Sequence, residues 1–310
     1  MTPLRIGSRG SKLALWQANF IREELARAHG VSAEIVNIKT SGDRFSQGAV
    51  GQIGLKGVFI KELEDALLGR EVDLAVHSMK DVPTEIPRGL AFPAIYRRED
   101  PRDCLVARDA RKFSALPNRA RIGTSSLRRQ AQLKHLRPDL VVEELRGNVD
   151  TRVRKLEEGQ YDGIVLAKAG LERLGWSEKI SDVFDAGSML PAVGQGALGM
   201  ECRGDDSRVM ELLGKLDHAE TRAGVSAERA LLARLEGGCQ VPLGAWGRLE
   251  NGRLRLDAIV LSADGAEHVR DIISGAPEDA EALGRELAER LLSAGARPLL
   301  KMAGRMIYDS

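Results

Sequence analysis

Residues 72–83 read Val-Asp-Leu-Ala-Val-His-Ser-Met-Lys-Asp-Val-Pro, a short apolar run followed at once by polar and charged residues. The run over 72–76 predicts a buried strand. A helical pattern over Val58–Leu68, ended by Gly69, precedes it. A helix followed by a buried strand with polar groups at its carboxyl end indicates an α/β fold.

The same alternation extends in both directions from this stretch. Upstream, the pattern predicts a strand at Leu4–Gly7, a helix over Ser11–His29 and a strand at Ala33–Lys39. Downstream, a second unit is predicted from strands at 105–107, 121–123, 140–142 and 161–167 and helices at 126–136 and 149–158. Two such units imply parallel or mixed sheets, with ligands bound where strands end and helices begin.

The C-terminal part follows a different pattern. A helix over Thr221–Leu235 precedes strands joined by Asn251-Gly252 and Asp264-Gly265, which are strong hairpin turns. Residues 253–257 alternate strictly, and a last helix is predicted over Pro277–Leu292. We therefore expect a third, α+β domain with a small antiparallel sheet.

Composition excludes several classes of protein. The chain has 310 residues, 43% hydrophobic and 29% charged, as expected for a globular protein of two or three domains. Its first residues lack the pattern of a secretory signal, and no apolar run approaches the length of a membrane span. The three cysteines, Cys104, Cys202 and Cys239, form no C-x-x-C pair. We expect a cytoplasmic protein without membrane, disulfide framework or metal site.

Positive charge is concentrated in one region. The net charge is +1, but Arg119–Lys155 carries ten Lys and Arg against four Asp and Glu. Within it, Gly123-Thr-Ser-Ser-Leu-Arg-Arg129 lies between a strand and a helix, where free N–H groups and the helix dipole favour an anion. Leu145-Arg-Gly-Asn-Val-Asp-Thr-Arg152 repeats the arrangement and suggests a second carboxylate or phosphate clamp. The alternatives are a plain helix cap for the first turn and surface salt bridges for the second.

Three further motifs have both a functional and an ordinary interpretation. The spacing of the dinucleotide-binding motif is matched by Gly194-Gln-Gly-Ala-Leu-Gly199. However, Pro191 interrupts the preceding segment and no apolar helix follows, so we interpret this motif as a hinge between domains. Lys80-Asp81 places a carboxylate where it can stabilise a developing positive charge, or merely form an ion pair. Cys239 follows Gly237-Gly238, where it is either an exposed nucleophile or a buried small side chain.

Five blocks, taken together, resemble the porphobilinogen deaminase family, over a match that runs from Arg9 nearly to the end of the chain. The blocks are Ala75-Val-His-Ser-Met-Lys-Asp-Val-Pro83, Gly123-Thr-Ser-Ser-Leu-Arg-Arg129, Leu145-Arg-Gly-Asn-Val149, Pro191-Ala-Val-Gly-Gln-Gly196 and Leu235-Glu-Gly-Gly-Cys-Gln-Val-Pro242. The resemblance implies two lobes like those of periplasmic binding proteins whose chain crosses twice, and a third small α+β domain. The implied domains are 1–98 with 197–216, then 99–196, then 217–310.

The resemblance also implies a reaction. Four porphobilinogen molecules are joined head to tail, with loss of ammonia, into hydroxymethylbilane, a precursor of haem and chlorophyll-type tetrapyrroles. The chain grows on a dipyrromethane cofactor held by a thioether to Cys239. Asp81 matches the catalytic carboxylate, which stabilises the azafulvene cation formed from porphobilinogen. The family is usually monomeric.

Further residues match binding positions of the family. The implied cofactor-binding residues are Cys239, Lys80, Asp81, Thr124, Ser126, Arg128, Arg129, Arg146 and Gly147, and the implied substrate-binding residues are Arg9, Ser11, Arg146, Arg152 and Arg173. Asp43, Lys56 and Phe59 match a loop and helix near the cleft, whereas Gln52 departs from the lysine of some relatives. Glycine at 48, 51, 54 and 57 predicts that Phe45–Gly57 is a mobile lid, with an ordinary surface loop as the alternative.

Two other functions fit parts of the sequence. A non-catalytic bilobal binding protein for a polycarboxylate ligand explains the anion sites but not a third domain with Gly-Gly-Cys. A nucleic-acid binder explains the basic stretch, but an aromatic content of 4% provides few stacking platforms. We therefore expect porphobilinogen as the partner and no nucleic acid.

Overall fold

The computed structural model describes residues 3–38, 60–235 and 241–300. The chain divides into two compact units. Unit one comprises Met1–Arg98 and Ala197–Arg222, and unit two comprises Glu99–Gly196 and Ala223–Ser310. In the described residues, no helix is both long enough and apolar enough to cross a membrane.

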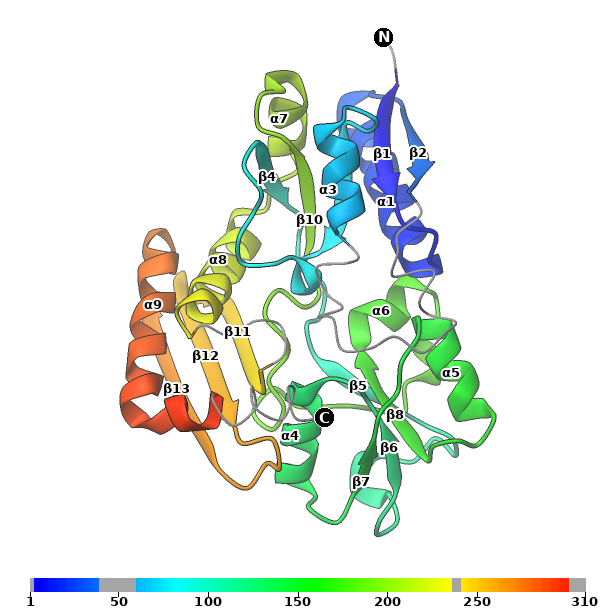
Figure 1. The fold of residues 1–310 in the computed structure, drawn as a ribbon, viewed down its shortest axis with the longest axis vertical. Helices are drawn as coiled ribbons and strands as arrows, with labels where there is room; N and C mark the ends of the chain where they lie inside the picture. The colour runs from blue at the N-terminus through cyan, green and yellow to red at the C-terminus, as the bar shows by residue number, and fades with distance from the viewer. Residues whose placement is uncertain (1–2, 39–59, 236–240, 301–310) are drawn as a thin grey trace. The chain divides into compact units, whose positions relative to one another are not determined.

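Unit one is built on a five-stranded mixed sheet in the order β2-β1-β3-β10-β4. Figure 1 labels β2, β1, β10 and β4 of this sheet. Its strands are β1 (Leu4–Ser8), β2 (Ala33–Asn37), β3 (Leu74–Ser78), β4 (Leu90–Ile95) and β10 (Leu198–Arg203). The first three run parallel, and β10 runs antiparallel to both β3 and β4. Helices α1 (Lys12–His29), α3 (Lys61–Leu68) and α7 (Ser207–Gly214) complete the unit.

Local sequence explains where α1 begins and ends. The Ser11 side chain caps the helix by accepting a hydrogen bond from the Ala14 N–H, and Gly30 ends it in the left-handed conformation, with φ of 62°. The buried face of α1 includes Ile21 and Leu25, which pack into the same core as Leu74. This packing fixes the helix against the sheet.

Unit two contains a second five-stranded sheet, in the order β7-β6-β8-β5-β9. Its strands are β5 (Asp103–Ala107), β6 (Arg121–Gly123), β7 (Val141–Glu143), β8 (Gly163–Ala167) and β9 (Asp182–Val183), and its helices are α4 (Leu127–Leu136), α5 (Val149–Glu157) and α6 (Lys168–Arg173). Strands β6, β7 and β8 are parallel, and β5 is antiparallel to β8 and β9. Both sheets thus share one pattern of order and direction, and the chain leaves unit one after Arg98 and returns at Ala197. The expectation of two similar α/β lobes is confirmed.

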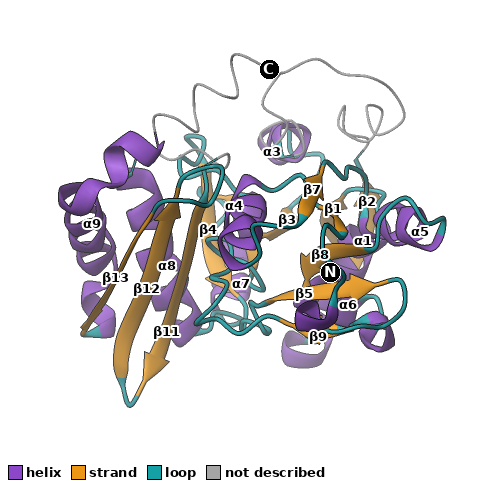
Figure 2. Cartoon of the chain, turned by 90° about the horizontal axis from the view of Figure 1, so that it is seen from below, coloured by secondary structure: helices purple, strands orange, loops and turns teal. Residues whose placement is uncertain are grey.

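A three-stranded antiparallel sheet forms the remainder of unit two. It consists of β11 (Leu243–Glu250), β12 (Arg253–Leu261) and β13 (His268–Gly275), with α9 (Ala280–Leu291). Helix α8 (Ala219–Arg234) begins in unit one and continues into unit two from Ala223. Asn251 and Gly252 have φ of 51° and 74° between paired Glu250 and Arg253, as a two-residue hairpin turn requires. Figure 1 and Figure 2 both show α9 running alongside β13, and Leu256 and Leu287 share one buried core. The α+β expectation is confirmed.

Three strands, β4, β9 and the fully buried β10, have no counterpart among the predicted elements. Residues 198–203 form β10, and every one of them is buried, whereas the sequence pattern predicts only a hinge over Gly194–Gly199. Glu201 and Arg203 interrupt the apolar run, so the segment does not resemble a central strand. The division into three domains stays a prediction, because the sheets of 99–196 and 223–310 belong to one compact unit.

Helix α8 approaches β11 so closely that two glycines face each other. A Cβ placed on Gly224 would lie 2.5 Å from the carbonyl oxygen of Gly247. We expect Gly224→Ala to destabilise the protein by about 1–3 kcal/mol, because the backbones must move apart. Gly214→Ala is the matched control, since a Cβ there meets no atom within 4 Å, and it should be neutral or stabilising by up to about 1 kcal/mol. Denaturant unfolding measures both, and equal stability of the two variants would contradict the packing argument.

Candidate active site

The turn that carries Lys80 and Asp81 is a single 3-10 turn, Met79–Asp81, directly after β3. The Met79 N–H donates to the Ala197 carbonyl at 3.0 Å, and the Gln17 side chain donates to the Ser78 hydroxyl at 2.8 Å. Lys80 and Asp81 are both half-buried. Met79 is buried against the position of Gly199 on β10, where any Cβ would collide with its sulfur. The return strand therefore supports the turn.

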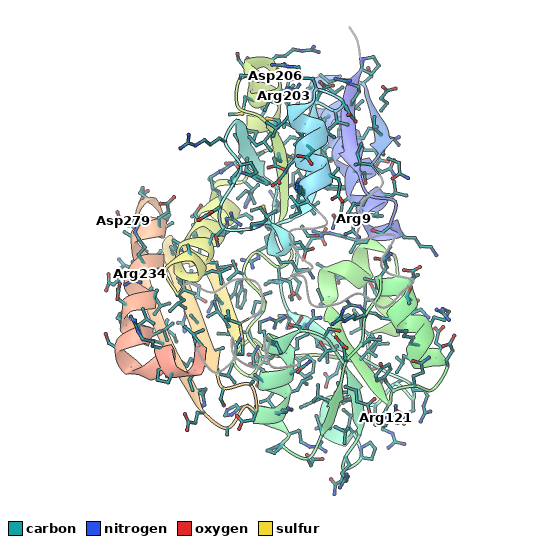
Figure 3. The ribbon with its side chains drawn as sticks, viewed as in Figure 1. Arg9, Arg121, Arg203, Asp206, Arg234 and Asp279 are labelled. Carbon is teal, nitrogen blue, oxygen red and sulfur yellow. The ribbon has the colours of Figure 1, made fainter. Side chains whose placement is uncertain are left out.

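Arg9 and Ser11 lie at the same end of the sheet as this turn. They follow β1, and β1 pairs in parallel with β3 through Ile6 and Leu74, so the two strands end at one edge. Figure 3 shows Arg9 at this end of β1. The four site residues predicted for the described part of unit one, Arg9, Ser11, Lys80 and Asp81, therefore all follow strands that end at the same edge of the sheet.

A buried ionisable pair lies next to this turn and was not predicted from the sequence. His77 is on β3 and Glu201 on β10, with Nε2 and Oε2 2.9 Å apart and side chains 4% and 1% exposed. Only the antiparallel pairing of β3 with β10 brings these two residues together. No spacing signal in the sequence reveals the pair.

In unit two, Thr124 and Ser126 occupy the connection between β6 and α4. Thr124 is buried; its N–H donates to the Glu143 carbonyl at 2.9 Å and its hydroxyl accepts from the Ser126 N–H at 3.3 Å. Ser126 is the N-cap residue of α4, but its side chain makes no capping hydrogen bond. Helix capping therefore does not explain this serine.

Arg128 and Arg129 have an internal partner that the sequence pattern did not indicate. Both side chains are buried and both bind Asp103, the first residue of β5, whose side chain is fully buried. Arg128 Nη1 donates to Asp103 at 2.6 Å, and Arg129 Nη2 donates to it at 2.7 Å. Their predicted role toward a ligand remains a prediction.

The two guanidinium groups of this cluster favour the ionised form of the Asp103 carboxylate. Burial alone would raise the pKa of Asp103, but the charges and hydrogen bonds of Arg128 and Arg129 outweigh burial and hold that pKa well below its ordinary value. Burial lowers the pKa of the Arg128 guanidinium. Among the described residues, no hydrogen-bond partner faces the buried Nε of Arg128.

The turn before α5 is more exposed. Gly147 has φ of 117°, and a Cβ there would lie 2.8 Å from Thr151, so the position requires glycine. Arg146 is exposed and pairs with Glu144 at 2.5 Å, and Arg152 Nε donates to the Gly147 carbonyl at 2.7 Å. The exposed Arg121, labelled in Figure 3, pairs with Glu143. Acidic neighbours thus balance part of the local positive excess.

Arg173, at the end of α6, lies against the glycine-rich turn. Its Nη2 donates to the Gly196 carbonyl at 2.8 Å, and its Nε is 3.0 Å from a carboxylate oxygen of Glu99. Burial lowers the pKa of this guanidinium. The structure therefore places Arg173 beside the segment through which the chain returns to unit one.

Several predicted site residues lie outside the described residues, so their roles stay predictions. They are Cys239, Asp43, Lys56, Phe59, Gln52 and the predicted lid Phe45–Gly57. The other two cysteines, Cys104 and Cys202, are buried, and burial raises the pKa of each thiol to about 12. Neither is a reactive thiolate near neutral pH. No cluster of His, Cys, Asp and Glu in the described ranges could hold a metal ion.

Two family models match the chain. The model described as "Porphobilinogen deaminase, dipyromethane cofactor binding domain" matches residues 4–211, and "Porphobilinogen deaminase, C-terminal domain" matches residues 223–293. The porphobilinogen deaminase of Trichlorobacter lovleyi is 54% identical over 299 residues, covering 96% of each chain. That of Pelotomaculum thermopropionicum is 52% identical over 301 residues, covering 97% of this chain and 96% of the relative. Among solved structures, the Bordetella pertussis BvgS VFT2 domain aligns with a TM-score of 0.42 at 15% identity, over 69% of this chain and 85% of that one.

The lowered pKa of Asp103 predicts a pH dependence of folding. In an unfolded chain, an aspartate has a pKa of about 3.9. Asp103 therefore stabilises the fold fully above that pH, and this stabilisation is lost as the pH falls from that value through the lower pKa of the folded protein. The stability difference between the parent protein and Asp103→Asn should therefore be largest near neutral pH and shrink below about pH 4. Asp109→Asn, which alters the exposed pair with Arg111, is the control and should change little. Unfolding measured across this range would refute the expectation if the Asp103→Asn difference stayed constant.

Proposed function

The chain belongs to the porphobilinogen deaminase family, and from that premise we propose that it joins four porphobilinogen molecules head to tail, with loss of ammonia, into hydroxymethylbilane. This proposal rests on the match of both family models, in order, over residues 4–211 and 223–293. The protein is thus a transferase of tetrapyrrole synthesis with a dipyrromethane cofactor-binding domain.

Cys239 is the proposed attachment residue of the cofactor. The two cysteines that the structure describes are buried, and their raised pKa values make them poor nucleophiles, which leaves Cys239 as the candidate for a thioether. When bound, the dipyrromethane supplies the terminal pyrrole to which substrate is added. It brings several carboxylates, which need cationic or N–H partners in the protein.

Asp81 is the proposed catalytic carboxylate. It lies at the strand end where Arg9, Ser11 and Lys80 also gather, on a turn anchored to the return strand at Ala197. A fixed carboxylate stabilises the cation that porphobilinogen forms on losing ammonia. The neighbouring cations and the hydroxyl are suited to the substrate's acetate and propionate groups.

Unit two is proposed to bind most of the cofactor and substrate carboxylates. The cofactor-binding set is Thr124, Ser126, Arg128, Arg129, Arg146 and Gly147, and the substrate-binding set is Arg146, Arg152 and Arg173. Support comes from the buried guanidinium groups of Arg128 and Arg129, which are held close together by one carboxylate. Arginine's planar fork matches a carboxylate with two parallel hydrogen bonds.

We further propose a cytoplasmic monomer with the three domains 1–98 with 197–216, 99–196 and 217–310. Three separate sheets support this division. The intact mass of the purified protein tests the function: two extra pyrrole units are expected. An unmodified mass, with tight binding of a polycarboxylate and no turnover, would favour a non-catalytic binding protein.

The variant Cys239→Ser should fold but lack the cofactor, because oxygen replaces the sulfur of the thioether. Turnover should vanish. Cys202→Ala is the matched control: this cysteine is buried in the core of unit one, so the change should lower stability while leaving the mass adduct in place. Intact-mass spectrometry reads both variants, and a normal adduct on Cys239→Ser would exclude this attachment residue.

The variant Asp81→Asn should keep the cofactor and lose most turnover, since a neutral amide of similar shape cannot stabilise the substrate-derived cation. A loss of about a hundredfold or more in kcat, with a smaller change in KM, is expected. Glu85→Gln, an exposed carboxylate in the same loop, should leave the rate unchanged. Near-parental kcat in cofactor-loaded Asp81→Asn would remove Asp81 from the catalytic role.

A further inference from the structure

Asp103 connects three segments of unit two that are far apart in the sequence. Its Oδ2 accepts a hydrogen bond from Arg128 Nη1 at 2.6 Å. Its Oδ1 accepts from Arg129 Nη2 at 2.7 Å and Nε at 3.0 Å, and from Gln195 Nε2 at 2.9 Å. All four side chains belong to buried residues. One carboxylate thus joins β5, the first turn of α4 and the Gly194–Gly196 turn.

Each partner of Asp103 has a second anchor. Arg128 Nη1 also donates to the Leu190 carbonyl at 2.8 Å, and Arg129 Nη1 donates to the Val165 carbonyl at 3.1 Å. Gln195 Nε2 donates to the Pro101 carbonyl at 2.6 Å. Two-point fixation restricts the rotation of both guanidinium groups, so less conformational entropy remains to be lost when they bind a ligand.

The charges within this cluster do not cancel. One carboxylate faces two guanidinium groups, and among the described residues the buried Nε of Arg128 has no hydrogen-bond partner. A buried cation is costly unless it is paired, and a buried donor is costly unless it is hydrogen-bonded. The arrangement is therefore suited to one further anionic group.

We propose that Asp103 and Gln195 are positioning residues: they hold Arg128 and Arg129 in the orientation in which these arginines bind carboxylates of the cofactor and growing chain. Neither residue needs to touch the ligand, because each acts through the guanidinium groups. The Gly194-Gln195-Gly196 turn then has a role in binding as well as in connecting the units. The inference rests on the proposed function, since that function supplies the carboxylates.

The test compares Asp103→Asn and Gln195→Met with the parent holoenzyme. Asp73→Asn is the matched control, because Asp73 in unit one also accepts hydrogen bonds from two arginines, Arg5 at 2.9 Å and Arg203 at 3.3 Å. Neither of these two arginines is a proposed site residue. For each protein, three quantities are measured: thermal stability, the fraction carrying the dipyrromethane mass, and KM and kcat for porphobilinogen. A fourth variant combines Asp103→Asn with Arg129→Gln, itself also measured alone.

The positioning role predicts a fall in the loaded fraction or a rise in KM of about tenfold for both unit-two variants, while Asp73→Asn loses only stability. The double variant should lose less than the product of the two single losses, because both changes remove the contact between Asp103 and Arg129. Normal loading and KM in Asp103→Asn, or losses that multiply in the double variant, would overturn the inference. If Asp103→Asn does not fold, the test rests on Gln195→Met. A loaded fraction and KM equal to those of the parent in Gln195→Met would then overturn the inference. A parent protein with neither adduct nor turnover would instead refute the proposed function and this inference with it.

Discussion

The insertion of β10 between β3 and β4 is the pairing on which the rest of unit one depends. Residues 198–203 follow unit two in the sequence and complete a sheet begun by β1. Pairing segments so far apart in the sequence costs loop-closure entropy before any contact forms. Burial of all six residues of β10 offsets this entropic cost. Without β10, the edges of β3 and β4 would be unpaired.

This strand also determines the environment of the proposed catalytic turn. Ala197 accepts the hydrogen bond from Met79, Gly199 makes room for the Met79 side chain, and Glu201 pairs with His77. At its far end Arg203 pairs with Asp73 and Asp206; Figure 3 labels Arg203 and Asp206 close together near the start of α7. One strand thus supports the turn that carries Asp81 and anchors the opposite end of the sheet.

In unit two, buried ion pairs fix the positions of proposed site residues. Arg128, Arg129 and Arg173 are removed from water, yet each contacts a carboxylate and a backbone carbonyl. Buried ion pairs of this kind contribute little net stability relative to an apolar core, because desolvation offsets their attraction. They do fix the positions of the guanidinium groups, and fixed positions are what the recognition of several carboxylates requires.

The sequence by itself determined most of the element order and the local turns. Gly30 ends α1, Asn251-Gly252 makes the hairpin, and Lys80-Asp81 follows a buried strand, because these features depend on residues that are neighbours in the chain. The spaced motifs also indicated the family. Only the tertiary structure decided that 198–203 is a central strand, that Asp103 holds Arg128 and Arg129, and that His77 meets Glu201. Those facts depend on which distant segments pack together, and charge counts and periodicity carry no information about partners so far apart along the chain.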